Sequence, residues 1–460
     1  MKQKSIRLDT IERNTLLLFV RMTVLMLISV VSVRFVRSQM GIEGYGVYTA
    51  LTGLVQMLIC FNAVLAAASQ RFFSVAIGTG DRQAMRSAFA VSRRLCRWLS
   101  LFIFVVFETV GLWFVNQKMQ YPPEQSAAVV VTYQLTLLAF LVNIIQIPWL
   151  AAVMAHEKMN IYTCASILEA VLKLGLALLL PFIPYNALVV YSAGLFAFSG
   201  ITTAIYIRYG RSHFSETQST MEECDTNLTR QMAQFGGWSL FGNIAGMLML
   251  QGNLLLLNVY RGPIVNADFA IALQVFGAFV VLGNNVIFAV RPQMTMAYAG
   301  NDYPKLNRLF LHSSIAVFGL MLLVAVPLTV WMPQVLTLWL GDTTPLMVTL
   351  CRLMIVNILI QIIGNQFTIV MQASGKVKEY HLVVETMSLL CFPLSWLFLH
   401  LGYSPETTVW IMIICMAIAH GLRIERVRRY YPVFPLTQYL VYNLLPIGVI
   451  LAGFIIYNLR

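Results

Sequence analysis

The amino-acid sequence predicts an all-α polytopic membrane protein, built as two six-helix bundles in a parallel pseudo-repeat with about 13 transmembrane helices. Three observations predict this fold class. Of the 460 residues, 59% are hydrophobic and only 11% are charged, whereas soluble proteins carry about 25% charged residues. The apolar stretches have the length of roughly 20 residues that a membrane-spanning helix needs. A stretch in the first half of the chain also recurs, in weaker form, in the second half.

Each apolar stretch is long enough to span a membrane as a helix, which excludes a barrel of short alternating strands. The positively charged residues lie mainly in loops that would face one side, so the N-terminus is predicted to be cytoplasmic. The same rule explains the net charge of +12 without a nucleic-acid partner. The predicted spans lie at about residues 14–37, 46–69, 96–115, 127–154, 160–181, 186–207, 236–259, 267–290, 309–331, 345–371, 380–400, 405–422 and 437–457.

The repeat is carried by an arginine and a turn. Arg71 is followed nine residues later by Gly80-Asp81, and Arg291 is followed nine residues later by Gly300-Asn301-Asp302. This equal spacing indicates two related halves placed end to end. The longest polar break lies between them, so we predict an N-terminal six-helix bundle at 1–210, a cytoplasmic linker at 211–234, a C-terminal six-helix bundle at 235–425 and an extra C-terminal transmembrane segment at 426–460.

The sequence lacks the common catalytic motifs. It contains no G-x-x-x-x-G-K-[ST] and no G-x-S-x-G, so we expect neither an enzyme nor a bound cofactor or metal. The one acidic patch, Glu216–Asp225, is expected to be solvated linker. Without a motif for ATP hydrolysis, any work on a substrate would be driven by a Na⁺ or H⁺ gradient or by the membrane potential.

Ionisable residues inside a span usually face a bundle interior or a watery cavity. Arg21 lies eight residues after Arg13, which predicts a depth of about 12 Å in the bilayer at 1.5 Å per residue. We predict that it contacts an anionic substrate in a cavity, the alternative being an ion pair with an acid such as Glu108. Arg34 and Arg37, at the outer end of the same span, and Arg352 are further cavity candidates, although the outer arginines can also snorkel to headgroups.

Acids and amides in the spans complete the candidate set. Glu108 is a candidate for cation coupling, or the partner of a buried cation. Glu169 and Lys173 are further coupling candidates, and at this spacing they can also neutralise each other. Asn62 and the stripe Asn357, Gln361 and Asn365, at i, i+4 and i+8, can bind sugar or join helices.

These features resemble a known family. The two-half plan, the segment Gly41–Tyr48 with its G-x-E-G-Y-G-V-Y pattern and the Arg71…Gly80-Asp81 pattern resemble Wzx-type polysaccharide (O-antigen, lipid-linked oligosaccharide) flippases over about residues 10–425. These flippases belong to the MOP superfamily, with the MATE drug exporters and the lipid II flippase. The thirteenth span departs from the usual plan of this family.

The resemblance implies a MATE-like, V-shaped pair of bundles with a central cavity that opens to each side of the membrane in turn. It implies that undecaprenyl-diphosphate-linked oligosaccharide moves to the outer leaflet of the bacterial inner membrane, for cell-surface polysaccharide biosynthesis. The implied partners are this substrate, membrane lipids, a polysaccharide polymerase and glycosyltransferases. Members of the family carry cationic cavity residues, and Arg21 fits that tendency.

Two other functions remain open. A MATE-type cation-coupled multidrug exporter would need acids in its cavity, but acids within the spans are few and Arg21 is the leading cavity residue. A membrane glycosyltransferase or polymerase would carry large outer loops, and the sequence predicts none. An anionic, lipid-borne substrate is therefore favoured.

Overall fold

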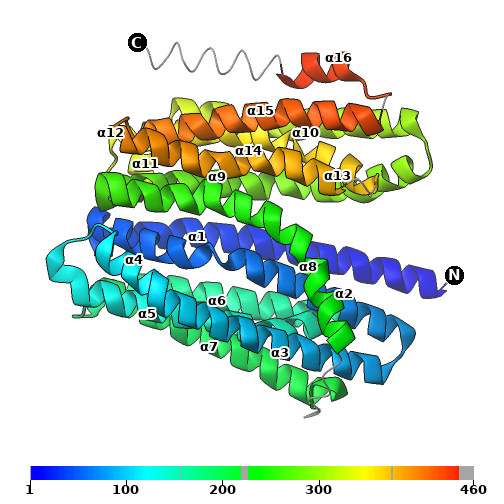
Figure 1. Ribbon diagram of the computed structural model, residues 1–460, viewed down its shortest axis with the longest axis horizontal. Helices are drawn as coiled ribbons and strands as arrows, with labels where there is room; N and C mark the ends of the chain where they lie inside the picture. Colours follow the sequence, from blue (N-terminus) through cyan, green and yellow to red (C-terminus); the bar gives the residue numbers. More distant parts are fainter. Residues whose placement is uncertain (1, 157, 219–225, 375–376, 432, 445–460) are drawn as a thin grey trace. The chain divides into compact units, whose positions relative to one another are not determined.

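A computed structural model describes the chain except for residues 1, 157, 219–225, 375–376, 432 and 445–460. The described chain is almost entirely helical and contains no strand, as the sequence predicts (Figure 1). It divides into two compact units, of which the first comprises Met1–Ile244 with Gly262–Ala267, and the second Ala245–Arg261 with Asp268–Arg460. The boundaries predicted for the linker and the terminal segment stay predictions.

The helices of the N-terminal unit pack around α5, which contacts α1, α2, α3, α6 and α7. In chain order the elements are α1 (Lys2–Gln56), α2 (Ile59–Thr79), α3 (Arg82–Val106), the π-helical segment η1 (Phe107–Gly111), α4 (Leu112–Gln117), η2 (Pro123–Gln125), α5 (Ser126–Ala155), α6 (Met159–Leu179), η3 (Leu180–Phe182), α7 (Ala187–His213) and η4 (Ser215–Gln218).

In the C-terminal unit, α15 packs against α12, α13 and α14. The elements from the linker onward are α8 (Thr226–Met247), the π-helical η5 (Leu248–Gly252), α9 (Asn253–Ala299), α10 (Tyr303–Val330), α11 (Met332–Leu340), α12 (Pro345–Ile362), α13 (Asn365–Ala373), α14 (Val377–His400), α15 (Glu406–Tyr430), α16 (Leu436–Tyr439) and the π-helical η6 (Leu440–Leu444).

Ten stretches of the described chain are long and apolar enough to span a membrane. Two of them, Val24–Ile77 and Ile244–Asn284, are 54 and 41 residues long, and each covers two predicted spans. Each contains one glycine with non-helical backbone angles, Gly41 (φ 71°, ψ 171°) and Gly262 (φ 86°, ψ 177°). A glycine with non-helical backbone angles therefore joins the first two spans of each half. Most of the predicted span 437–457 lies outside the described residues.

The repeated turn has the same local geometry in both halves. Gly80 is left-handed (φ 70°), and the side chain of Asp81 accepts hydrogen bonds from the backbone N–H groups of Gln83 and Ala84, which caps the start of α3. In the second half, Asn301 is left-handed (φ 55°) and Asp302 accepts from the N–H of Lys305 at the start of α10. The left-handed residue falls one position later in the copy, which explains the extra residue before its aspartate.

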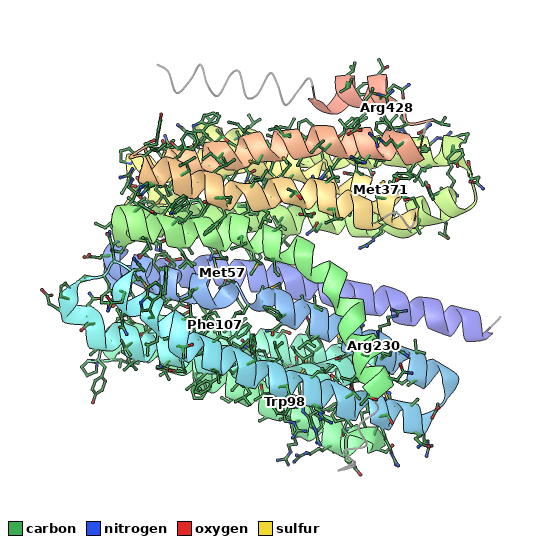
Figure 2. The ribbon with its side chains drawn as sticks, in the orientation of Figure 1. Met57, Trp98, Phe107, Arg230, Met371 and Arg428 are labelled. Carbon is green, nitrogen blue, oxygen red and sulfur yellow. The ribbon has the colours of Figure 1, made fainter. Side chains whose placement is uncertain are left out.

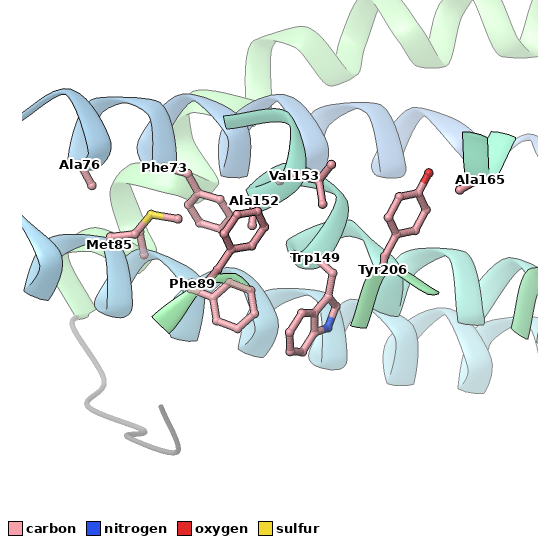
Figure 3. Close-up of a cluster of buried hydrophobic side chains, with 12 residues drawn as sticks. Phe73, Ala76, Met85, Phe89, Trp149, Ala152, Val153, Ala165 and Tyr206 are labelled. Carbon is pink, nitrogen blue, oxygen red and sulfur yellow. The ribbon is translucent and has the colours of Figure 1, made fainter. Parts of the chain in front are cut away.

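An aromatic core fixes the helices of the N-terminal unit near one end (Figure 3). The ring of Phe89 on α3 lies 6.1 Å from the ring of Phe73 on α2 and 4.9 Å from that of Trp149 on α5. Buried rings in these tilted and edge-to-face arrangements add about 0.5–1.5 kcal/mol per pair beyond burial. This core holds α2, α3 and α5 beside the elements that carry Arg21 and its neighbours.

Candidate functional site

Arg21 is held on α1 by an aromatic ring on α6. Its guanidinium carbon lies 4.2 Å from the centroid of the Tyr162 ring, a cation–π contact. The side chain is half-buried, and its Nε atom is buried with no hydrogen-bond partner among the described residues. A cation in this setting retains hydrogen-bonding capacity for a bound anion.

The contact of Arg21 lies close to one end of α6. Tyr162 is only three residues after Met159, the first residue of α6, so the contact is about 4.5 Å along that helix from its end. The depth of about 12 Å in the bilayer, counted from Arg13, stays a prediction. The cation thus lies at the end of the N-terminal unit that is predicted to face the cytoplasm.

The neighbours of Arg21 form a polar cluster within the N-terminal unit. Tyr206 on α7 lies within electrostatic range of Arg21, Tyr162 and Glu169, and Ser166 donates a hydrogen bond of 2.7 Å to the backbone carbonyl of Tyr162. We call Arg21, Tyr162, Ser166, Glu169, Lys173 and Tyr206 the α1–α6–α7 cluster. It combines one cation without an ion-pair partner among the described residues, hydroxyl groups and one internal ion pair.

That ion pair joins the two coupling candidates on α6. The Nζ atom of Lys173 lies 2.6 Å from Oε1 of Glu169, at the i, i+4 spacing. The acid therefore already has a counter-charge, which leaves Arg21 as the cation available to a ligand. Their role in coupling stays a prediction.

Glu108 is bound by an amide and not by Arg21. It lies in the π-helical segment η1 and accepts a hydrogen bond of 3.0 Å from Nε2 of Gln134 on α5. Among the described residues, no cation lies within ion-pair distance of it. The backbone carbonyl of Phe107 (labelled in Figure 2) accepts from the N–H of Leu112, the i to i+5 bond of the π-helix, and also from the hydroxyl of Tyr133 at 2.6 Å. The interpretation of Glu108 as the partner of Arg21 is wrong.

The other candidates of the N-terminal unit differ in exposure. Arg34 is exposed, as snorkelling would require, whereas Arg37 is only 3% exposed and lies within electrostatic range of Tyr45. Arg37 therefore does not snorkel to headgroups. Asn62 on α2 is half-buried, and its Oδ1 atom is buried without a partner among the described residues.

In the C-terminal unit the predicted amide stripe is interrupted. Nε2 of Gln361 donates to Oδ1 of Asn357 at 3.2 Å, so the first two members are joined on α12. Asn365 begins α13, beyond a break in the helix, and bonds Asn284 at 3.5 Å instead. Arg352 is buried and donates from Nε to the carbonyl of Thr329. The period of 3.6 residues applies only within an unbroken helix, so the structure does not form one continuous stripe.

The prediction that Glu216 is solvated is wrong. Glu216 is 8% exposed and its Oε1 atom lies 2.6 Å from Nε2 of His156, whose ring stacks on Phe214 at 4.2 Å. Burial alone would raise the pKa of Glu216, but the hydrogen bond from His156, a backbone N–H and the charge of His156 lower it below its usual value. The pair fastens the start of the linker to the end of α5.

Sequence analysis also missed two buried charged residues of the C-terminal unit. Asp268 is fully buried and accepts a hydrogen bond of 2.6 Å from Thr344, which caps α12. Arg423 is buried on α15 beside the break between α12 and α13. Both lie close to the predicted span ends, where a charged residue in the sequence is indistinguishable from an ordinary loop charge.

The fold is similar to that of solved transporters described as members of the MOP superfamily. A multidrug resistance MATE family transporter in an inward-facing conformation matches 88% of this chain and 94% of its own, with a TM-score of 0.70 and 14% identity. A MOP superfamily transporter from Pyrococcus furiosus, described by the reverse polarity of its binding pocket, matches 92% of this chain and 95% of its own, with a TM-score of 0.66 and 16% identity. At these identities the likeness establishes the fold alone.

Sequence comparison adds one relative. The uncharacterized membrane protein EpsK of Bacillus subtilis is 21% identical over 313 residues, which are 67% of this chain and 61% of EpsK. The chain thus spans about three fifths of the length of that relative. No family model matches the sequence.

Proposed function

We propose that this protein is a transporter that moves undecaprenyl-diphosphate-linked oligosaccharide from the inner to the outer leaflet of the bacterial inner membrane, for cell-surface polysaccharide biosynthesis. The observation that carries the proposal is the state of the charges in the N-terminal unit. The buried Nε of Arg21 has no partner among the described residues, whereas Glu169 is neutralised by Lys173 and Glu108 is bound by Gln134.

The chemistry of the α1–α6–α7 cluster suits the headgroup of such a lipid. A guanidinium binds phosphate oxygens through paired, charge-assisted hydrogen bonds. The hydroxyls of Tyr206 and Ser166 and the ring of Tyr162 are groups that bind and stack on sugars. A diphosphate with sugars cannot enter hydrocarbon unaided, and a cationic polar surface inside the protein lowers that barrier.

The second candidate function is cation-coupled export of drugs, because the neighbours in fold include multidrug MATE transporters. For that function Glu108 is the relevant residue. It lies in a π-helical segment, a feature frequent at functional sites, and among the described residues only an amide binds it. The two functions make opposite demands on the same unit, since one depends on Arg21 and the other on an acid.

The test uses the full chain in proteoliposomes with a fluorescent undecaprenyl-diphosphate-linked oligosaccharide, scored by how much label becomes accessible on the opposite leaflet. We expect Arg21→Ala to abolish transfer and Arg21→Lys to retain part of it. Arg429→Ala is the matched control, because Arg429 is exposed and paired with Glu425 outside the cluster. Transfer by Arg21→Ala at the rate of the unmodified protein would refute the proposal. Efflux of a cationic dye that Glu108→Gln abolishes would favour the exporter.

A further inference from the structure

The C-terminal unit contains a break in its most buried span. Of the apolar window in Pro345–Met371, 78% is buried, yet α12 ends at Ile362 and α13 begins at Asn365. A break exposes the last carbonyl groups of one helix and the first N–H groups of the next. Inside a membrane protein these groups need partners from elsewhere in the structure.

The carbonyl side of the break has such a partner. The hydroxyl of Tyr439, on the short helix α16, lies 3.4 Å from the carbonyl oxygen of Ile363 and 2.9 Å from Nε2 of His420 on α15. Tyr439 is fully buried, and its ring lies 5.1 Å from that of Phe367 on α13. The terminal segment of the chain therefore supports the break directly.

A cation lies at the N–H side of the break. A Cβ atom on Gly364 would fall 1.9 Å from Nη1 and 2.9 Å from Cζ of Arg423, so the guanidinium fills the space next to the start of α13. A side chain at this position would displace the guanidinium from the start of α13.

Arg423 lacks a counter-charge within the described chain. It is 9% exposed, its Nε atom is buried without a partner, and no described acid lies within ion-pair distance. Gln366, in the first turn of α13, is 1% exposed, and neither atom of its amide has a partner among the described residues. Buried charges and amides of this kind are normally satisfied, so their state points to a bound group that the described residues do not supply.

We propose that Arg423 and the N-terminus of α13 form a binding site for a phosphoryl group in the C-terminal unit. Helix N-termini bind phosphate through their free N–H groups and the positive end of the helix dipole, and α13 has nine residues. A phosphoryl group offers several oxygens, which serve Nε of Arg423 and these N–H groups together. A lone carbonyl or hydroxyl ligand would leave the charge uncompensated.

The phosphoryl group has two sources, a lipid headgroup or a free phosphate. Arg423 lies seven residues before Tyr430, the end of α15 that is predicted to be cytoplasmic, so a lipid in the inner leaflet and a soluble anion both reach that level. The lipid-borne source deepens the proposed function and rests on it. The phosphoryl site itself does not rest on the proposed function, because it is inferred from the buried charge of Arg423 and from the break between α12 and α13.

The first measurement is binding of inorganic pyrophosphate to the purified full chain, followed as the increase in thermal midpoint against sodium chloride of equal ionic strength. We expect a saturable increase, and about tenfold to hundredfold weaker binding in Arg423→Gln, which loses charge-assisted hydrogen bonds. Gly364→Ala should weaken binding similarly, because it displaces the guanidinium and keeps the charge. Arg429→Gln, at the exposed pair with Glu425, should bind as the unmodified protein does. No increase in the unmodified protein, or unchanged binding in Arg423→Gln, would overturn the proposal.

A second measurement needs no variant and stays decisive if these variants fail to fold. Hydrogen–deuterium exchange, read by mass spectrometry, reports the protection of backbone amides. We expect pyrophosphate to slow exchange in the peptide that contains the start of α13 and to leave the peptide around Phe89 on α3 unchanged. Equal exchange at the start of α13 with and without pyrophosphate would refute the site.

Phosphatidylcholine nanodiscs with and without undecaprenyl diphosphate then identify the source. Protection by the lipid at a lower amount than inorganic pyrophosphate assigns the site to a lipid headgroup, and protection by pyrophosphate alone assigns it to a free phosphate. Either result supports the phosphoryl site. These protection measurements do not depend on transport. A result that refutes the phosphoryl site can therefore be told apart from a result that refutes lipid transfer.

Discussion

Replacement of Gly111 by alanine is predicted to destabilise the N-terminal unit. An added Cβ would lie 2.1 Å from the hydroxyl oxygen of Tyr133 and 3.2 Å from Cδ1 of Phe107. Tyr133 is fully buried, and its hydroxyl is bonded to the carbonyl of Phe107 at 2.6 Å. The hydroxyl therefore has to leave that carbonyl, or the π-helical segment has to change.

The size of the loss follows from three contributions. The buried hydroxyl of Tyr133 that loses its acceptor costs about 1–3 kcal/mol, and overpacking a buried site costs about 1–3 kcal/mol. Alanine recovers about 1 kcal/mol of helix propensity relative to glycine. We expect the free energy of unfolding to fall by roughly 3 kcal/mol. Gly175→Ala on α6 is the control, because a Cβ there meets nothing within 4 Å, and it should be neutral or slightly stabilising.

A double-mutant cycle in detergent micelles, measured by denaturant unfolding, tests the cause. Tyr133→Phe removes the hydroxyl and should cost about 1–2 kcal/mol. In the double variant the nearest obstacles lie at 3.2 Å, so Gly111→Ala should add little to the loss from Tyr133→Phe. Additive losses from the two substitutions would show that the hydroxyl is not the obstacle.

Two further predictions concern the ends of the units. Because the folded pKa of Glu216 is below its usual value of 4.5, its pairing should stabilise the protein above that pH and be lost as the pH falls through the folded pKa. Glu216→Gln should remove the fall of the thermal midpoint that protonation of Glu216 causes at acid pH. Adding His156→Ala to Glu216→Gln should have little further effect. An acid dependence of the thermal midpoint that Glu216→Gln leaves unchanged would contradict the pairing. Tyr439→Phe should lower the free energy of unfolding by about 1–2 kcal/mol, whereas Tyr442→Phe, at an exposed position, should not; equal effects would refute the support of the broken helix by α16.

The number and order of the spans were predictable because every helix that crosses a lipid bilayer needs about 20 mostly apolar residues. Apolar length alone identified the described spans, and the two glycine junctions near residues 41 and 262 fell between predicted spans. The repeat was visible for a similar reason. An aspartate cap after a left-handed residue is local chemistry, and both halves keep it.

The partners of charged residues were not predictable, because they depend on contacts between distant segments. Glu216 was expected in solvent, and its partner His156 is 60 residues away. The contact of Arg21 with Tyr162 likewise joins residues far apart in the sequence. The amide stripe failed because the break after Ile362 has no strong signal in the sequence except Gly364, and a lone glycine does not by itself predict a broken helix.

The charges of the described spans, and not the fold, are what the proposal of an anionic cargo rests on. Within the described spans, Glu169 is neutralised and Glu108 is held by an amide. Arg21 and Arg423, one in each unit, have no described acid within ion-pair distance. A buried or half-buried cation without a counter-charge is unfavourable, so anion binding at Arg21 or Arg423 would stabilise the protein. For an exporter of cations the relevant group is Glu108, which has no cation within ion-pair distance among the described residues. The decisive comparison is therefore whether pyrophosphate or a cationic drug raises the thermal midpoint of the same preparation.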